Sequence, residues 1–571
     1  MPGPIRLPVV ALAALFALIV LAQGISAPFQ KDAEPQSAQW MVSIVRDGRW
    51  LLPRDYYGFV DRKPPLFYWL SALLTDASGG AVDETRARLV SLAAGTGLAT
   101  LVLLWTAANI GEIEGWLAFL FLLGIYGFSS RATLALTDMM MTLIAIGAYL
   151  TIFPLLSGER SGRRVIAAGV LLGMGILTKG PVAVVLVALA ALIFMLTERQ
   201  NPLAILKDSW PWQIAAIAIA IAACWYIPAT IEGGRRVVGI FLAENFGHFM
   251  PRSYGGTGEA ARPIWYIVAR TVGGSLPIVL LIPAAIAALV TGEIPGVRRR
   301  PILYQSSFAL AVITFFSIAS AKRDDYILPA MPGIAIMCAA VFRIDDSASG
   351  TTHWGARLRN ATVVSIAVTA LAIPMVGWWF APALGGALIR MQSSDEQMLA
   401  ILLSQHMWTM GFFAIAWVAA LLALFALRRD PVAVGASVGV IALAGSLLFN
   451  AAIRPALARA RSLKAFSSEV RPMVGDAPLF LVHEVSYELS FYWGGKIPTL
   501  AGKFRAEQPA DRSSFLIAYD NEIDAIPIDV RARMKLRARA EVIGGAGPPA
   551  LYEISPDGTG VHLKDGGGAG K

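Results

Sequence analysis

The stretch Asp61-Arg62-Lys63-Pro64-Pro65-Leu66-Phe67-Tyr68-Trp69-Leu70 places three charged side chains and two prolines directly before an apolar, aromatic run. It lies in a chain of 571 residues, of which 56% are hydrophobic and 15% are charged. This composition is too apolar for an average soluble domain. Charge is costly near bilayer-embedded segments unless a site needs it. We therefore expect a membrane protein in which this stretch belongs to a functional site.

Apolar runs recur along most of the chain at about the length that crosses a bilayer as a helix, roughly 17–25 residues. We predict about thirteen transmembrane helices. They lie near residues 6–23, 88–107, 115–130, 137–155, 165–178, 181–197, 212–230, 266–290, 303–320, 327–342, 360–381, 409–427 and 433–450. Only Lys179-Gly180 separates the fifth run from the sixth, so these two could form one broken helix. The first run reads as a retained signal anchor, because no good small-x-small cleavage site follows it.

The distribution of basic residues predicts the orientation of these helices. Placing Arg6 in the cytoplasm puts the basic loops on the cytoplasmic side, as the positive-inside rule requires. These loops are residues 159–164, 298–300, 357–359 and 428–429. The net charge of +9 then reflects topology rather than nucleic-acid binding, because the sequence has no basic stripe interleaved with aromatic residues. Cys224 and Cys338 fall inside predicted spans, and we expect both to be buried thiols.

Two domains are expected. Residues 1–452 form the transmembrane domain, and residues 453–571 form a small C-terminal α/β domain outside the cytoplasm. The external loop 24–87 is too long for a simple connector, which predicts a functional segment. Its stretches 36–45 and 67–69 read as amphipathic interfacial helices, because aromatic rings suit the headgroup zone.

In the C-terminal region the pattern changes to short apolar runs. Residues 478–482 and 515–519 read as buried strands. The polar segment 529–538 is compatible with a helix, and residues 551–554 follow it. These features predict the α/β fold of this domain, and the glycine-rich tail after residue 565 is expected to be flexible.

Many charged residues fall on the predicted non-cytoplasmic side of the bundle. They are Asp32, Glu34, Arg62, Lys63, Arg131, Asp138, Lys179, Arg262, Lys322 and Arg323. The positive-inside rule does not place basic residues there. A cluster of cations on this face calls for an anion, and a lipid phosphate is the natural candidate, since Lys and Arg bind phosphate through charge-assisted hydrogen bonds. The carboxylates beside them are candidates for a general base.

Each of these residues also has a structural alternative. Asp138 could cap the helix that follows it, and Lys179 could extend from a helix end toward water. Asp32 and Glu34 could be solvated loop charges. Asp324-Asp325 could only neutralise the arginine before them. The coincidence of so many charges on one face is the stronger signal.

The chain resembles the GT-C class of polytopic glycosyltransferases that use a polyprenyl-phosphate sugar donor. Within this class it is most similar to the lipid A aminoarabinose transferases and the protein O-mannosyltransferases. The resemblance covers about residues 5–340 and rests on seven motifs in the same order. They are Asp32-Ala33-Glu34, GRWLLP at 48–53, RKPPLFYW at 62–69, Leu136-Thr137-Asp138, LTKGP at 177–181, RPIWY at 262–266 and AKRDDYILPAMP at 321–332.

This resemblance implies a polytopic α-helical fold and an inverting transfer of a sugar at the outer face of the bacterial inner membrane. It implies that the donor phosphate is bound by Arg62, Lys63, Lys179, Lys322 and Arg323. It implies that the catalytic carboxylates are Asp32, Glu34 and Asp138, with Asp32 or Glu34 activating the acceptor. The donor or acceptor pocket is then expected to contain Tyr68, Arg262, Tyr266 and Tyr326. Cations that stabilise the leaving phosphate supply much of the catalysis.

The expected acceptor is a lipid A-like glycolipid or another cell-envelope glycan, and the protein is expected to act as a monomer among membrane lipids, without nucleic acid. A protein O-mannosyltransferase is the alternative within enzymes. A transporter or flippase of lipid-linked intermediates is the alternative of another class. Transporters carry inverted repeats and polar residues near the bilayer midplane, whereas these charges gather at one edge. Whether the sugar is a hexose or a pentose stays open.

Two departures from the family pattern concern a metal. The family's glutamate before Lys-Pro is Arg62 here, and a histidine often found before the Pro-x-Trp-Tyr segment is Ala261. Some members bind a metal at these positions. We expect neither a metal nor another cofactor here, because the preferred ligands are missing and an arginine repels a dication. The alternative is a metal site rebuilt from Asp61, Asp138 or His248.

The acidic motif also departs from the family register. Counting back from Gly48 places Glu34 on the family's glutamate and Ala33 on its aspartate. Asp32 then lies one residue out of register. The choice between Asp32 and Glu34 as the base therefore stays open.

Overall fold

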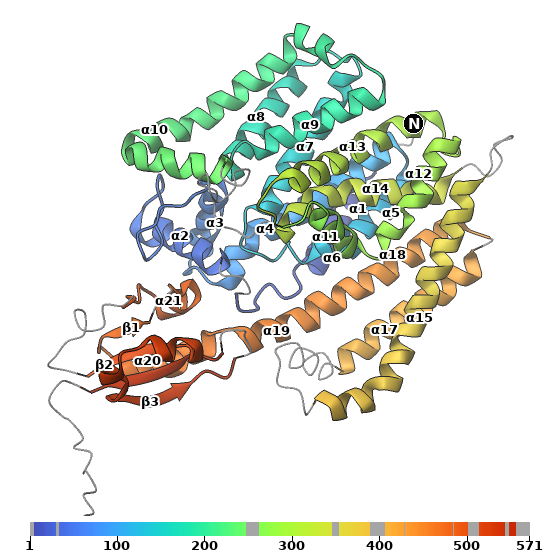
Figure 1. The fold of residues 1–571 in the computed structure, drawn as a ribbon. Helices are drawn as coiled ribbons and strands as arrows, with labels where there is room; N and C mark the ends of the chain where they lie inside the picture. Colours follow the sequence, from blue (N-terminus) through green and yellow to red (C-terminus); the bar gives the residue numbers. More distant parts are fainter. Residues whose placement is uncertain are drawn as a thin grey trace, which may run out of the picture.

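The computed structural model of the protein describes most of the chain. The described residues are 5–29, 33–246, 262–344, 353–388, 406–427, 429–482, 485–500, 513–542 and 547–555. They form a bundle of long helices with a small sheet domain at one end (Figure 1). The helices follow the apolar runs of the sequence, because a helix satisfies its own backbone hydrogen bonds inside a bilayer.

The helical part begins with α1 (Leu7–Leu21), and the long external loop that follows contains α2 (Ala33–Asp47) and α3 (Leu66–Ala77). The bundle continues with α4 (Glu84–Asn109), α5 (Glu112–Gly124), α6 (Tyr126–Ser129), α7 (Asp138–Leu156), α8 (Gly162–Lys179), α9 (Val182–Thr197), α10 (Trp210–Phe246), α11 (Tyr266–Ser275), α12 (Ile282–Thr291), α13 (Gly296–Ile318), α14 (Met331–Ala340), α15 (Trp354–Leu388), α17 (His406–Ala426) and α18 (Pro431–Leu448). The two helices expected inside loop 24–87 are thus present as α2 and α3.

Each of the thirteen predicted spans lies on residues of these helices or of the short helical turns between them. Within the described residues, six helices are long and apolar enough to cross a membrane, or seven if one bent pair counts as a single span. Four further apolar helices are shorter, among them α1 and α9. A polytopic helical architecture is therefore confirmed, while the count of thirteen stays a prediction.

One predicted span is a bent pair of helices, and the two neighbouring spans that could have formed one broken helix are separate helices. Residues 266–290 contain α11 and α12 with a bend of 102° between them, near Pro277, which has no N–H to continue a helix. The runs on either side of Lys179-Gly180 form two separate helices, α8 and α9. Gly180 connects them with φ +75°, a backbone conformation that glycine adopts without steric cost.

The C-terminal domain is built on a four-stranded sheet with the order β1-β2-β4-β3. Its elements are α19 (Arg454–Arg461), α20 (Lys464–Val474), β1 (Leu479–Leu481), α21 (Tyr487–Trp493), β2 (Ser514–Ala518), α22 (Ile528–Arg531), β3 (Met534–Arg539) and β4 (Ala550–Ile554). Strand β1 pairs with β2 in parallel, and the other pairs are antiparallel. The two buried strands expected from the sequence are confirmed.

Two expectations for this region need correction. Only residues 529–531 of the segment 529–538, which was expected to be helical, lie in a helix, α22. Residues 534–538 belong to strand β3, which pairs with β4 at the edge of the sheet and leaves polar side chains in solvent. The expected domain boundary at 452/453 falls inside a continuous run of helix. There α18 passes through a π turn, Phe449–Ile453, into α19. The separate hydrophobic core of the domain begins only at Leu463.

The C-terminal domain packs on the external loop through α21, which lies beside α2 (Figure 1). The Gln39 Nε2 donates to the carbonyl of Tyr487 at 2.9 Å. The Tyr57 hydroxyl lies 2.5 Å from Ser490 Oγ and donates to the carbonyl of Ile497 at 3.1 Å. These contacts hold α21 against the loop that carries the charged stretch.

Candidate active site

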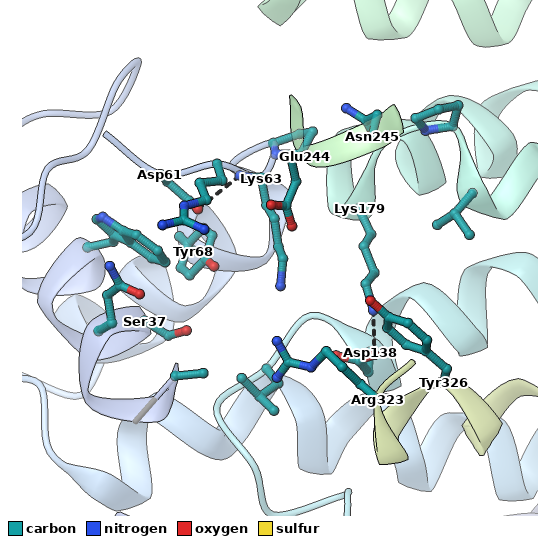
Figure 2. Close-up of a pocket in the computed structure, with 18 of the residues that line it drawn as sticks. Ser37, Asp61, Lys63, Tyr68, Asp138, Lys179, Glu244, Asn245, Arg323 and Tyr326 are labelled. Atoms are coloured by element: carbon teal, nitrogen blue, oxygen red, sulfur yellow. Dashed lines mark hydrogen bonds and ion pairs between the residues drawn. The ribbon is translucent and has the colours of Figure 1, made fainter. Parts of the chain in front are cut away.

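A cavity of about 560 Å³ lies where the ends of several helices meet the external loop. Its walls come from α2, the loop before α3, the first turn of α7, the turn between α8 and α9, and the end of α10. The residues after α13 and the first residue of α21 complete it. The predicted site residues that line it are Arg62, Lys63, Tyr68, Asp138, Lys179, Arg323 and Tyr326. Figure 2 shows most of them converging from different elements.

The centre of one wall is an ion pair between two helix ends. Lys179 is the last residue of α8 and Asp138 is the first residue of α7. The Lys179 Nζ lies 2.5 Å from Asp138 Oδ1, and it lies 5.3 Å from the centre of the Tyr326 ring. Asp138 is therefore not the cap that the structural alternative proposed, because the N-cap position is occupied by Thr137.

The opposite wall is the charged stretch itself. Asp61 is 3% exposed, and its Oδ1 accepts the backbone N–H of Lys63 at 2.9 Å. Within the described residues, Oδ2 of Asp61 has no hydrogen-bond partner. Burial raises the pKa of Asp61 to about 8, although the Lys63 N–H and ammonium both counteract this shift. The side chain of Lys63 interacts electrostatically with Asp61 and also with the Asp138–Lys179 pair, which places it between the two walls.

Arg323 reaches the cavity from the short helical turn after α13. Its Nη2 lies 3.7 Å from Oδ2 of Asp325, whose other oxygen lies 3.2 Å from Nε of Arg131. Asp324 turns away and pairs with Arg270 at 2.5 Å. Only one of the two aspartates therefore faces Arg323, and that aspartate is shared with a second arginine.

One predicted phosphate ligand, Lys322, and two predicted pocket residues, Arg262 and Tyr266, do not line this cavity. The Lys322 Nζ donates to the carbonyls of Arg262 at 2.9 Å and Ala319 at 2.6 Å. The guanidinium of Arg262 stacks on the ring of Tyr266, 4.4 Å from its centre. The Tyr266 hydroxyl in turn hydrogen-bonds to Asp324. Lys322, Arg262 and Tyr266 therefore stabilise the chain beside the cavity, which corrects their expected placement.

Glu34 is also placed away from the cavity. It is fully buried, and its two carboxylate oxygens accept from Arg88 Nε at 2.9 Å and Nη2 at 3.1 Å. The backbone N–H of Ala135 donates to the same carboxylate. Glu34 is thus neither a solvated loop charge nor a residue of the cavity wall. Its buried ion pair with Arg88 connects the external loop to α4. Asp32 lies outside the described residues, whereas the next residue, Ala33, lines the cavity.

The sequence interpretation missed several wall residues. The motifs predict no role for Asp61 in the transfer reaction. Glu244 and Asn245 at the end of α10 lie beyond the predicted span 212–230. Helix α10 kinks at Gly234, which has φ +58°, so its last turns return to the cavity. The sequence shows that Glu244 and Asn245 are polar, but their position in the cavity wall depends on the kink in α10. Tyr487 comes from the C-terminal domain, far along the chain.

Candidate metal ligands are sparse in the part of the chain that is described. It contains no group of three or more His, Cys, Asp or Glu side chains placed to hold a metal ion. His248 and Ala261 lie outside the described residues. The cavity wall does contain the carboxylates Asp61, Asp138 and Glu244.

Residues 62–227 match the family model described as dolichyl-phosphate-mannose-protein mannosyltransferase. The undecaprenyl phosphate-α-4-amino-4-deoxy-L-arabinose arabinosyl transferase of Aeromonas hydrophila subsp. hydrophila is 27% identical over 335 residues, which are 55% of this chain and 56% of that protein. The protein of the same name from Enterobacter sp. (strain 638) is 27% identical over 56% of this chain and 57% of that protein. The chain thus matches these curated relatives over a little more than half of their length.

The fold is shared over nearly the whole chain with a solved structure. ArnT from Cupriavidus metallidurans bound to undecaprenyl phosphate superposes with a TM-score of 0.74 at 18% identity, covering 96% of this chain and 98% of that one. Its apo state gives a TM-score of 0.71. The resemblance to the aminoarabinose transferases is therefore confirmed, and so is a polytopic helical fold with a small C-terminal sheet.

Proposed function

From this match to the mannosyltransferase family model and this ArnT-type fold, we propose that the protein is a membrane glycosyltransferase that uses a polyprenyl-phosphate sugar donor. The observation that carries the proposal is the gathering of Lys63, Lys179 and Arg323 at one cavity at the ends of apolar helices. A lipid phosphate has its charge at the membrane surface and its chain in the bilayer. Such a cavity suits the shape of this lipid, and we place the cavity at the outer face of the inner membrane.

In the proposed reaction the acceptor oxygen attacks the anomeric carbon from the side opposite the phosphate. The carbon–oxygen bond to the phosphate breaks, and its electron pair leaves with the lipid phosphate. Lys63, Lys179 and Arg323 stabilise the charge that develops on that leaving group. Asp138 holds the Lys179 ammonium in place through the 2.5 Å contact. Arg62 is exposed at the cavity rim, where it adds positive charge near the incoming lipid.

For the substrates, we propose transfer of an amino pentose to a lipid A-like glycolipid, in keeping with the names of the curated relatives. A protein acceptor is the second candidate, favoured by the family model that matches residues 62–227. Transport of a lipid-linked intermediate is the third. It predicts movement of the donor across the bilayer without cleavage of its sugar–phosphate bond.

The test is a reconstituted assay. Purified protein is incubated with undecaprenyl phosphate-linked 4-amino-4-deoxy-L-arabinose and isolated lipid A, and the products are analysed by mass spectrometry. Modified lipid A together with free undecaprenyl phosphate supports the proposal. A parallel reaction with a polyprenyl-phosphate mannose donor and a peptide tests the second candidate. An intact donor in both reactions would refute a transferase function.

We also propose that transfer requires no divalent metal. The motivation is Arg62, which stands where some relatives have a metal-binding glutamate and which cannot shed its charge. At about 4 Å and an effective dielectric near 20, each pair of like unit charges costs about 4 kcal/mol. Treatment with a strong chelator should therefore leave the transfer rate unchanged. Activity that is lost on chelation and restored by one specific metal would contradict this.

A further inference from the structure

We propose that Asp61 is the proton acceptor of the transfer reaction, and that its Oδ2 takes the proton from the O–H group of the acceptor. This inference rests on the proposed transferase function and assigns a step within it. In this step the acceptor O–H bond breaks and its proton binds Oδ2. The freed oxygen electron pair forms the new bond to the anomeric carbon, and the lipid phosphate departs with the electron pair of the old bond.

The geometry leaves one oxygen of Asp61 open to a ligand. The carboxylate lines the cavity and is 3% exposed. Oδ1 is held by the Lys63 N–H, and the two prolines that follow restrict the backbone of this loop. Oδ2 has no hydrogen-bond partner within the described residues. Because buried polar atoms are nearly always paired, an unpaired carboxylate oxygen in a cavity wall indicates a place for a substrate hydroxyl.

The other carboxylates near the cavity are less suited to this step. Glu34 is locked between Arg88 and the backbone of Ala135, away from the cavity. Asp138 is bound to Lys179. Protonation of Asp138 would remove the contact that holds the Lys179 ammonium in place for the leaving phosphate. Asp61 lies apart from that pair with Lys63 between them, so proton uptake and phosphate stabilisation are performed by different groups (Figure 2).

The charges around Asp61 suit a base that works near neutral pH. Lys63 on its own loop favours the charged carboxylate of Asp61, and Glu244 from α10 disfavours it. Tyr68 from α3 is the phenol that interacts with the Asp61 carboxylate, and it favours the charged form. The net effect of burial and these neighbours is a pKa of about 8 for Asp61. A general base is most effective when its pKa is close to the working pH.

The experiment compares Asp61→Asn and Asp61→Glu with the wild type in the reconstituted transfer assay. Asp61→Asn should lower kcat by roughly 10²–10⁴-fold, the usual contribution of a positioned base, with little change in donor KM. In the wild type, kcat/KM should rise with pH to a plateau above about 8 as Asp61 ionises. This rise should vanish in Asp61→Asn and return, at a lower rate, in Asp61→Glu.

Asp55→Asn is the matched control. Asp55 lies in the same loop and is 5% exposed, and it accepts hydrogen bonds from the backbone of Tyr57 and Phe59 and from Gln36. It does not line the cavity, so Asp55→Asn should keep the wild-type pH dependence. Binding of undecaprenyl phosphate by each purified variant reports whether its site is folded.

Several outcomes would overturn the assignment. One is a normal kcat and pH profile in Asp61→Asn. A second is a rise in donor KM alone, confined to amino sugars, which would make Asp61 a binding group for the ammonium. A third is loss of the pH dependence in Asp32→Asn while Asp61→Asn keeps it. If the wild type transfers no sugar from any polyprenyl-phosphate donor, the proposed function itself fails and this step fails with it.

Discussion

The proposed phosphate site rests on three cationic side chains, Lys63, Lys179 and Arg323, which line one cavity at the ends of apolar helices. Their contributions differ, because Lys179 is paired with Asp138 and Arg323 faces Asp325. Lys63 donates its backbone N–H to Asp61, while its ammonium lies between the two walls. Lys63 is therefore the residue whose removal should most directly affect the donor phosphate.

Lys63→Ala should weaken binding of undecaprenyl phosphate by roughly 10–100-fold, because a hydrogen bond to a charged group contributes about 1.5–3 kcal/mol. Binding to the purified protein in detergent can be measured by isothermal titration. Arg54→Ala is the control, since Arg54 is an exposed cation of the same loop outside the cavity wall. Equal affinity in Lys63→Ala and the wild type would exclude the proposed role.

Glu34 belongs to the acidic motif in which we expected the base, yet it lies in a buried ion pair with Arg88. Glu34→Gln should lower the stability of the protein by about 3–5 kcal/mol, because it leaves the fully buried Arg88 without its counter-ion. Thermal unfolding in detergent measures this loss. Glu112→Gln is the control, because Glu112 is exposed in the first turn of α5, and this variant should change the thermal stability little. A stable but inactive Glu34→Gln protein would instead support Glu34 as the base.

Among the secondary-structure elements, the turn between α8 and α9 has the strictest local requirement. Gly180 has φ +75° and ψ −160°, a region that is essentially limited to glycine. A Cβ atom at this position would overlap Oδ1 of Asn245. The turn therefore couples the position of Lys179 to the end of α10, and both line the cavity.

Gly180→Ala should destabilise the protein by roughly 1–3 kcal/mol through backbone strain and should also weaken donor binding, because Lys179 and Asn245 would shift. Gly147→Ala provides the contrast. Gly147 lies inside α7, and an added Cβ would make only an ordinary contact of 3.7 Å with Leu171. The same two measurements, thermal unfolding and undecaprenyl phosphate binding, should separate the variants. Normal donor affinity in Gly180→Ala would show that the turn does not position the site.

At the scale of the whole molecule, the C-terminal domain completes the cavity. Its Tyr487 lines the wall, and its Lys464 pairs with the buried Glu84 of α4 at 2.8 Å. The Tyr492 hydroxyl donates to the same carboxylate at 3.0 Å. The domain thus serves as part of the site and as a partner for a buried charge.

Ending the chain after Arg461 should therefore abolish transfer and lower the thermal stability of the remaining bundle. The physical reason is that Gln39, Tyr57 and Glu84 would lose their partners and the cavity would lose one wall. The transfer assay and thermal unfolding measure the two effects. The Tyr487→Ala variant keeps the domain and should impair transfer with a smaller change in stability. A truncated protein with wild-type turnover would show that the domain is dispensable.

Hydropathy and motif order predicted much of this protein. The helices could be placed because, in a bilayer, a run of apolar residues must satisfy its hydrogen bonds within the same segment, which makes the outcome a local property. Lys63, Asp138, Lys179 and Arg323 were brought to one cavity as expected, because each lies at an end of an element on the same predicted face.

The partners of these residues depended on the tertiary structure. Glu34 and Arg88 are 54 positions apart and meet only because α2 packs beside α4. The return of Glu244 to the cavity depends on a kink in α10. Asp61 shares the cavity with Glu244 and Tyr487, which are distant in the chain. Composition and spacing report what a segment can form, whereas the burial and pairing of a charge depend on which segments surround it after folding.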